Sequence, residues 1–309
     1  MRVIDLRARR AAVAQAAPID VCICTFHRAA VADAVLSAAR QIPTPARILV
    51  IDNAETPEAA GRVALIQTRT SVPLVYVHAP ARNISVARNA ALDAATAEWL
   101  AFLDDDEVAQ PGWLAALLAR ARSVACDAVL GPVDAVYPLD APAWIRDLDT
   151  HSTRPVAVRG TLRKGYAGNV MLRRATVTRL GLRFDSALGR TGGEDDRFFY
   201  DLTDAGGVIA YAPDALALEP APAARLTLTW LMRRSFRTGQ SHGARLRRIH
   251  GPIGRLGQIV LAAGKVCASA GGAVLNMANP ARRNRWLLRL SLHAGAVARL
   301  AGGGELELY

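Results

Sequence analysis

The chain has 309 residues and is strongly basic, with 38 Lys and Arg against 27 Asp and Glu and a net charge of +11. This length suits one large domain or a domain with an appendage, and a hydrophobic content of 51% excludes disorder for most of it. The charge is uneven, because residues 220–304 hold 14 Lys and Arg and no Asp or Glu. This acid-free segment predicts an anionic partner.

The N-terminus and the cysteines indicate the compartment. Residues 1–17 lack the apolar core of a secretory signal. Cys22 and Cys24 alternate on an expected strand without the spacing of a zinc site, which favours buried thiols in a reducing environment. Residues 256–278 are the most apolar stretch, but Lys265 and several glycines make them a weak membrane span. We therefore expect a cytoplasmic protein and leave its attachment to a membrane open.

Strand-like and helix-like segments alternate from residue 19 onward, which predicts parallel β-α-β units. The expected strands are 19–25, 47–52, 74–78, 99–103, 126–136, 166–172 and 206–211. The expected helices are 29–40, a segment capped by Asn83 and running to about 97, one starting near Pro111, 194–205, and a basic helical region from Leu226. Residues 137–165 form a long irregular segment, which is usually functional or disordered.

Polar residues stand at the carboxyl ends of the first four expected strands. They are Thr25, Asp52, His78 and Asp104. Because ligands of parallel α/β sheets bind at this edge, these positions are the first candidates for a site.

Two acidic motifs carry the chemistry. Asp104, Asp105, Asp106 and Glu107 follow an apolar strand, and hard carboxylate oxygens suit Mg²⁺ or Mn²⁺. If this backbone is extended, Asp104 and Asp106 point the same way. The alternative is a solvated acidic turn that caps a helix.

The second acidic motif follows a pair of glycines. Gly192 and Gly193 precede Glu194 and Asp195, so that flexible backbone delivers carboxylates to a helix start, where one could serve as a general base. The alternative is an ordinary helix whose first turn contains acidic residues, which would give the same sequence pattern. Arg88, in an expected helix, could meet a diphosphate or simply face solvent.

The order of these motifs resembles glycosyltransferase family 2, the inverting enzymes with a GT-A fold. The likeness covers about residues 18–242, with the acid cluster similar to the family's Asp-X-Asp motif and Glu194-Asp195 similar to its Glu-Asp motif. The motifs Phe-Leu-Asp-Asp-Asp-Glu and Thr-Gly-Gly-Glu-Asp are similar to motifs of bacterial exopolysaccharide transferases of the succinoglycan type. The Gln-X-X-Arg-Trp motif of processive synthases is absent from the sequence, which favours transfer of a single sugar.

The resemblance implies a role for each matching residue. Asp195 would be the catalytic base, and Thr25 and Asp52 would hold the nucleoside of a nucleotide-sugar donor, which the family suggests to be a UDP-sugar. The implied donor-binding set is Thr25, Arg28, Asp52, Arg88, Asp104 and Asp105. The implied acceptor-binding set is Glu194, Asn169 and Trp144. The divalent cation, Mg²⁺ or Mn²⁺, would be held by Asp106 and Asp104, with His242 near the metal and diphosphate or, equally, exposed at a helix end.

The expected fold is therefore an α/β, Rossmann-like GT-A domain with a mostly parallel sheet and a basic helical C-terminal extension. The domain would span 18–242, with a nucleotide-sugar half at 18–136 and an acceptor half at 137–242, and the extension would be 243–309. Arg, Trp and Leu on amphipathic helices suit an anionic membrane surface, so residues 225–300 would dock on the inner face of the plasma membrane. The acceptor would then be a lipid-linked sugar or an oligosaccharide. Nucleic acid is not expected as a partner, since the sequence shows no known nucleic-acid-binding module.

Three other readings are weaker. The Asp104–Val108 stretch also fits the Asp-X-Asp-X-Val pattern of haloacid-dehalogenase-like phosphatases, but it follows the fourth strand instead of the first. A non-catalytic sugar-nucleotide or membrane-binding protein of the same fold is the main alternative. A Rossmann dehydrogenase lacks support, because no Gly-X-Gly-X-X-Gly follows the first strand.

Overall fold

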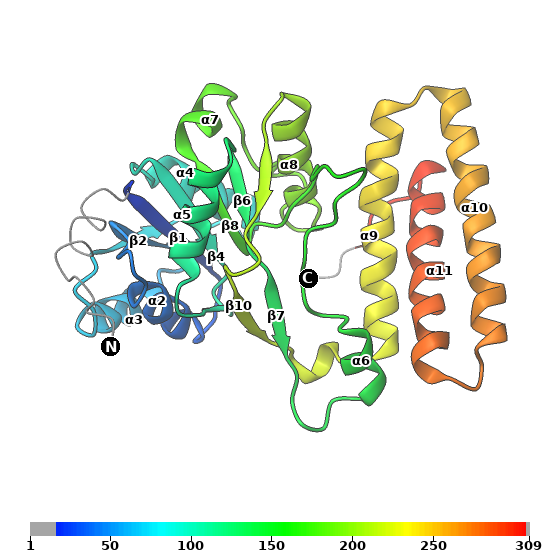
Figure 1. The fold of residues 1–309 in the computed structure, drawn as a ribbon, viewed down its shortest axis with the longest axis horizontal. Coiled ribbons are helices and arrows are strands. Elements are labelled where there is room, and N and C mark those ends of the chain that lie inside the picture. The colour runs from blue at the N-terminus through cyan, green and yellow to red at the C-terminus, as the bar shows by residue number, and fades with distance from the viewer. Residues whose placement is uncertain (1–16, 307–309) are drawn as a thin grey trace, which may run out of the picture. The chain divides into compact units, whose positions relative to one another are not determined.

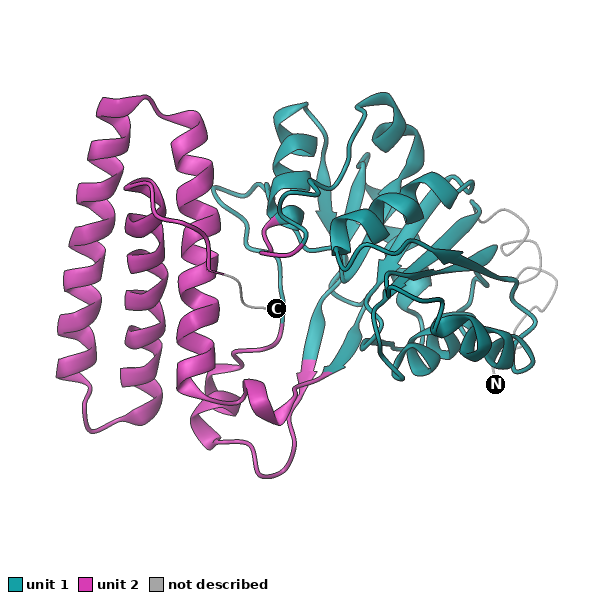
Figure 2. Cartoon of the chain, turned by 180° about the vertical axis from the view of Figure 1, so that it is seen from behind, with its two compact units in different colours: residues 1–134, 153–189, 194–219 teal, residues 135–152, 190–193, 220–309 magenta. Residues whose placement is uncertain are grey.

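The computed structural model describes residues 17–306, which form two compact units (Figures 1 and 2). The first unit comprises residues up to 134 together with 153–189 and 194–219. The second comprises 135–152, 190–193 and the chain from 220 onward. The expected boundary at 242 falls inside a continuous helix, so the structure divides the chain at other positions than the sequence predicts.

A seven-stranded sheet of order β3-β2-β1-β4-β8-β6-β9 forms the centre of the first unit. The strands are β1 (Ile19–Thr25), β2 (Arg47–Asp52), β3 (Leu74–His78), β4 (Trp99–Leu103), β6 (Ala128–Leu130), β8 (Asn169–Arg173) and β9 (Ile209–Tyr211). Neighbouring strands are parallel, except that β8 runs antiparallel to both β4 and β6. β1 and β4 are buried along their whole length, which explains why their residues are apolar except for Asp20 and Thr25 in β1.

Helices cover both faces of this sheet. Helices α2 (Val31–Ala39), α3 (Ala59–Gln67) and α5 (Trp113–Ser123) share one apolar core with alternate strand residues such as Val21 and Ile23. Helices α4 (Ile84–Ala94), α7 (Arg174–Arg179) and α8 (Glu194–Asp204) share the opposite core with residues such as Cys22 and Cys24. Both of these thiols are free and buried, as the sequence indicates.

A small second sheet and several short elements complete the fold. Its order is β5-β10-β7, with β5 at Val108–Ala109, β10 at Ala217–Pro220 and β7 at Val133–Val136. The segment 137–165, expected to be irregular, contains the short helix α6 (Ala143–Leu148). The strand expected from Tyr166 begins at Asn169, and Asn83 caps α4 by accepting from the N–H groups of Ser85 and Val86.

Three long helices dominate the second unit: α9 (Leu228–Ile249), α10 (Pro252–Leu275) and α11 (Pro280–Leu300), with the 3₁₀ turn η1 (Ala223–Arg225) before them. α11 packs against both α9 and α10. Glycines allow the close packing of α9 on α11, since a Cβ on Gly239 would lie 1.8 Å from the carbonyl oxygen of Leu292, and one on Gly295 would lie 2.0 Å from that of Phe236. Arg282, Arg285 and Arg289 line an exposed face of α11, as expected.

Candidate active site

The acid cluster after β4 forms a turn at the carboxyl edge of the sheet. The N–H of Glu107 donates to the carbonyl of Asp104 at 3.1 Å. Residues 104–107 therefore form a turn, whereas an extended backbone was expected. Even so, Asp104 and Asp106 are half-buried while Asp105 and Glu107 are buried, so the first pair is accessible and the second is not. Burial, with further contributions from Asp104 and other carboxylates, raises the pKa of Glu107 well above its ordinary value.

Residues at the end of β1 hold Asp105, one of the two buried members of this cluster. Thr25 donates its hydroxyl to Asp105 at 2.7 Å, and Arg28 donates to the other oxygen of Asp105 at 3.2 Å. Arg28 also forms an ion pair with Asp106. Burial raises the pKa of Asp105 to about 6, although Arg28 and Thr25 oppose the shift. Three residues expected to bind the donor therefore contact one another directly.

Arg88 joins the two acidic motifs. It projects from α4, is buried, and its guanidinium lies 2.7 Å from Glu194, 2.5 Å from Asp195 and 3.5 Å from Asp104. Burial by itself would lower the pKa of Arg88, but the carboxylates of Asp195, Asp104 and Glu194 outweigh it and raise the pKa above its ordinary value. Arg88 neutralises acids in the structure, and its expected contact with a diphosphate stays a prediction.

Asp195 sits in the first turn of α8 and is separated by Glu194 from two glycines with φ of +86° and +94°. Such left-handed backbone explains why Gly192 and Gly193 stand there, as the sequence indicates. One oxygen of Asp195 meets Arg88, and the other accepts the N–H of Ala167 at 3.0 Å. Burial raises the pKa of Asp195 to about 7, while Arg88 and the Ala167 N–H favour its charged form. The carboxylate thus changes protonation near neutral pH.

Asp52 is held by the protein itself. It is 1% exposed, and its oxygens accept from the N–H groups of Ala54 and Ala59 and from the hydroxyl of Tyr76 at 2.8 to 3.0 Å. These bonds fix the β2–α3 loop and the start of α3. Asp52 therefore has a structural role in this loop, and its expected contact with the nucleoside stays a prediction.

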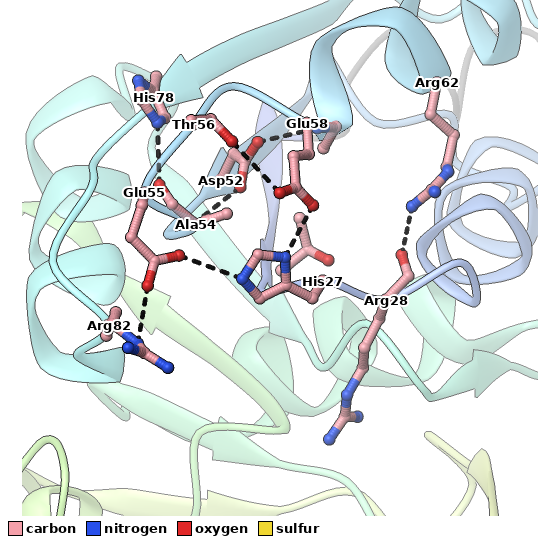
Figure 3. A network of polar contacts seen from close by, with 12 residues as sticks. His27, Arg28, Asp52, Ala54, Glu55, Thr56, Glu58, Arg62, His78 and Arg82 are labelled. Carbon is pink, nitrogen blue, oxygen red and sulfur yellow. Dashed lines mark hydrogen bonds and ion pairs between the residues drawn. The ribbon is translucent and has the colours of Figure 1, made fainter.

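A polar network surrounds this loop at the surface (Figure 3). His27, at φ +54°, lies between Glu58 at 2.7 Å and Glu55 at 3.1 Å, and Arg82 pairs with Glu55 at 2.8 Å. The hydrogen bond that His27 donates to the Glu58 carboxylate, with a smaller contribution from the one to Glu55, raises the pKa of His27. Arg62 donates to the carbonyl of Arg28, which ties α3 to the loop after β1.

Asn169 also has a structural role. It is fully buried in β8, its amide donates to the carbonyls of Pro132 and Ala215 at 2.9 and 2.8 Å, and its oxygen accepts from the indole of Trp113 at 2.7 Å. The side chain joins β8 to α5 and to the residues that precede β7 and β10. Its expected role in binding the acceptor stays a prediction.

Two further expected site residues belong to the second unit. Trp144 is half-buried and packs on the apolar cluster of Ala141, Ile145, Ala221, Leu226 and Leu231. His242 is exposed on α9. Their roles at the acceptor and at the metal stay predictions. Within residues 17–306, no group of three or more His, Cys, Asp or Glu side chains is arranged as a metal site.

Comparison with known proteins identifies the arrangement. The model of the family "Glycosyl transferase family 2" matches residues 20–181, which include Thr25, Arg88 and the acid cluster. The chain belongs to glycosyltransferase family 2. The chain is also 45% identical over 295 residues to the succinoglycan biosynthesis protein ExoM of Rhizobium meliloti (strain 1021), covering 94% of this chain and 95% of that protein. The expected family and its exopolysaccharide-type resemblance are thereby confirmed.

Solved structures of other glycosyltransferases share the fold. A mannosyltransferase from Pyrobaculum calidifontis, solved with GDP-Man and Mn²⁺, gives a TM-score of 0.60 at 19% identity, covering 93% of this chain and 88% of that one. GalNAc-T7, solved with UDP, GalNAc and Mn²⁺, gives 0.55 at 16% identity, covering 66% of this chain and 43% of that one. The family 2 chain therefore has the GT-A fold with an added helical region, as the sequence predicts.

Proposed function

We propose that this glycosyltransferase moves one sugar from a nucleotide-sugar donor, for which a UDP-sugar is our choice, to a glycan or lipid-linked acceptor, with inversion of configuration. The observation that carries the proposal is that Arg88 forms ion pairs with both Asp104 and Asp195. It thereby brings the motif expected to bind the diphosphate close to the candidate base. The likeness to ExoM supports a place in exopolysaccharide synthesis. The neighbours solved with GDP-Man and with UDP support a nucleotide-sugar donor.

Asp195 would perform the proton transfer. Its carboxylate takes the proton of the acceptor hydroxyl while that oxygen bonds to the anomeric carbon, and the bond from this carbon to the diphosphate breaks on the opposite side. One displacement of this kind inverts the configuration. The Ala167 N–H and Arg88 hold the carboxylate in place before the reaction, which reduces the cost of aligning it. The nucleoside diphosphate leaves as an anion and needs no proton.

The residues present fit a divalent cation. Mg²⁺ usually binds through one or two carboxylates together with substrate phosphates and waters, and Asp104 and Asp106 are the accessible carboxylates of the cluster. A bound cation would neutralise charge that develops on the diphosphate. Arg28 and Arg88, which now pair with Asp106 and Asp104, would then be free to turn toward the donor phosphates.

Removing Asp106 tests the cation site. We expect Asp106→Ala to weaken Mn²⁺ binding by about tenfold or more, because Mn²⁺ would lose one of two protein carboxylates. Calorimetric titration of Mn²⁺ in the presence of UDP measures this effect. Asp134→Ala, which removes an exposed carboxylate elsewhere, is the control. Equal Mn²⁺ affinity and metal-dependent activity in Asp106→Ala would exclude the assignment.

The pKa of Asp195 predicts the pH dependence. Because the base must be deprotonated and its pKa is raised to about 7, kcat/KM should rise as pH increases through 7. At one pH unit below that pKa the rate should be about tenfold below its plateau. Initial rates of donor turnover between acid and mildly alkaline pH measure the profile. A rate that is already constant from weakly acid pH upward would contradict this role.

The second unit supports a membrane surface as partner. Within residues 17–306, α10 alone is long and apolar enough to cross a membrane, a test that core helices of soluble proteins also pass. One face of α10 exposes large apolar side chains at helical spacing: Ile253 (90%), Leu256 (63%), Val260 (65%) and Val274 (68%). The opposite face carries the buried residues Ala262, Ser269 and Ala273, and α10 packs on the Arg-rich α11. This arrangement favours a helix that lies in the interface instead of spanning it.

The positive charge of residues 220–304 favours an anionic lipid surface over a second copy of the chain as the partner that covers the exposed face of α10. Residues 220–304 contain no acid, so two such surfaces would repel each other, whereas each basic residue near an anionic leaflet contributes about 1 kcal/mol. The protein would then work at the cytoplasmic face of the plasma membrane, where a lipid-linked acceptor is available.

Vesicle sedimentation tests the membrane surface. We expect the protein to sediment with vesicles containing phosphatidylglycerol, less so at high salt, and the double variant Leu256→Glu/Val260→Glu to lose most of this binding. Leu65→Glu, which adds one such charge at a position 71% exposed on α3, should bind like wild type. Unchanged sedimentation of the double variant would refute the α10 surface.

A further inference from the structure

Residues 301–306 return to α9 after α11. The carbonyl of Gly304 accepts the side-chain amide of Gln240 at 2.8 Å, and the N–H of Leu306 donates to the oxygen of the same amide at 2.9 Å. Gln240 is buried, at 2% exposure. One buried amide therefore holds the backbone on both sides of Glu305, which places the Glu305 carboxylate in a defined position.

Arg237 connects this tail to the loop that precedes α8. Its buried guanidinium donates to the carbonyls of Thr191, at 2.6 Å, and Gly192, and it forms an ion pair with Glu305 at 3.0 Å. The hydroxyl of Thr191 also donates to Glu305, at 3.2 Å. A single cation thus ties together α9, the C-terminal tail and residues 191–192, all of which belong to the second unit.

The loop that is held in this way needs external support. Gly192 and Gly193 both have positive φ, and glycine reaches many other conformations at little cost. A Cβ on Gly193 would lie 2.9 Å from the hydroxyl oxygen of Ser241, so the backbone also packs closely on α9. Glu194 and Asp195 follow in the chain at once. Whatever fixes residues 191–193 therefore fixes the position from which α8 starts.

We propose that the ion pair between Arg237 and Glu305 is a positioning clasp, which holds the Gly192-Gly193 backbone and through it the carboxylate of Asp195. Neither residue need touch the substrate. Arg237 acts on the loop through the two backbone carbonyls, and Glu305 compensates the buried charge of Arg237 and orients it. The inference rests on the proposed role of Asp195 as base and assigns a function in catalysis to the C-terminal tail.

Kinetics of full-length Glu305→Ala and Glu305→Gln test the clasp. A displacement of about 1 Å at a catalytic group can cost about 10²-fold in rate. We therefore expect kcat for donor turnover to fall by about 10- to 100-fold in Glu305→Ala and less in Glu305→Gln, which can still accept a hydrogen bond. The melting temperature should fall, because the buried Arg237 charge loses its partner. The variant should still be folded at the assay temperature and keep UDP affinity with Mn²⁺ close to wild type, which separates positioning from loss of folding.

Arg299→Gln is the matched control, because Arg299 pairs at 3.1 Å with the Glu305 oxygen opposite to the one that Arg237 and Thr191 contact. We expect it to keep most of kcat. Wild-type kcat in Glu305→Ala would overturn the clasp, as would an equal loss in Arg299→Gln or a loss explained by unfolding. Turnover by wild type in the same assay separates these outcomes from failure of the proposed function, in which wild type itself would be inactive.

Discussion

Asp195→Asn is expected to abolish sugar transfer while donor binding persists. The amide is nearly the same size as the carboxylate and can still accept the N–H of Ala167, so the start of α8 should keep its shape. It cannot take the proton of an acceptor hydroxyl. Since general bases contribute about 10²- to 10⁴-fold, kcat should fall by about that factor, whereas UDP affinity, measured by calorimetry with Mn²⁺, should stay near wild type.

Asp196→Asn controls for charge in the same turn of α8. Asp196 is partly exposed and lies 3.8 Å from Lys164, in the same first turn of α8 as Asp195. It should retain nearly full activity. Substantial transfer by Asp195→Asn, or an equal loss in Asp196→Asn, would show that the base is another group.

Arg88→Met should destabilise the fold as well as stop the reaction. Arg88 is buried among three carboxylates, so its removal leaves negative charges in the interior without compensation. Breaking a buried ion pair in this way costs about 3–5 kcal/mol. The free energy of unfolding from denaturant titration measures the loss. The pKa of Asp195 should rise further, because the cation that favours its charged form is gone.

Arg183→Met is the control for a surface ion pair. Arg183 and Asp93 are both more than half exposed and lie 2.5 Å apart. Exposed pairs contribute about 0–1 kcal/mol, so this variant should lose little stability. A free energy of unfolding for Arg88→Met equal to that of Arg183→Met would mean that the acids around Arg88 are solvated or protonated, contrary to the structure.

The sequence predicted the parallel strands well for a physical reason. β1, β2, β3 and β4 have the bounds that their apolar runs indicate, because each is flanked by polar residues and helix signals. The direction of β8 was not predictable in this way. The apolar pattern of a buried strand is the same whether the strand is parallel or antiparallel to its neighbours. The long connection through 137–165 is compatible with either direction of β8.

Motifs predicted which residues gather at the site better than what each of them contacts. Asp104, Arg88 and Asp195 do meet, whereas Asp52 and Asn169 have their polar atoms used inside the protein. A residue's identity and place at a strand end do not reveal which neighbouring N–H groups will claim its oxygens. Those N–H groups are positioned by loop conformations, which leave no periodic pattern in the sequence.

The C-terminal region was predicted by composition and not by contacts. Its helical and basic character holds, but α9 runs through position 242 without interruption, so the expected boundary has no structural counterpart. The acid-free segment ends at Glu305, and this first acid is the partner of the buried Arg237. A lone acid after a long basic stretch was the available signal, and only the fold shows which cation it meets.

Proton NMR of donor hydrolysis in the absence of acceptor tests the central claim most directly, because the anomer of the released sugar records the displacement. With UDP-α-glucose and related α-linked donors, a single displacement assisted by Asp195 predicts that the β anomer appears first, and that Asp195→Asn greatly slows its release. Initial release of the α anomer would contradict inverting transfer. Binding of every donor without turnover would favour the non-catalytic sugar-nucleotide-binding protein instead.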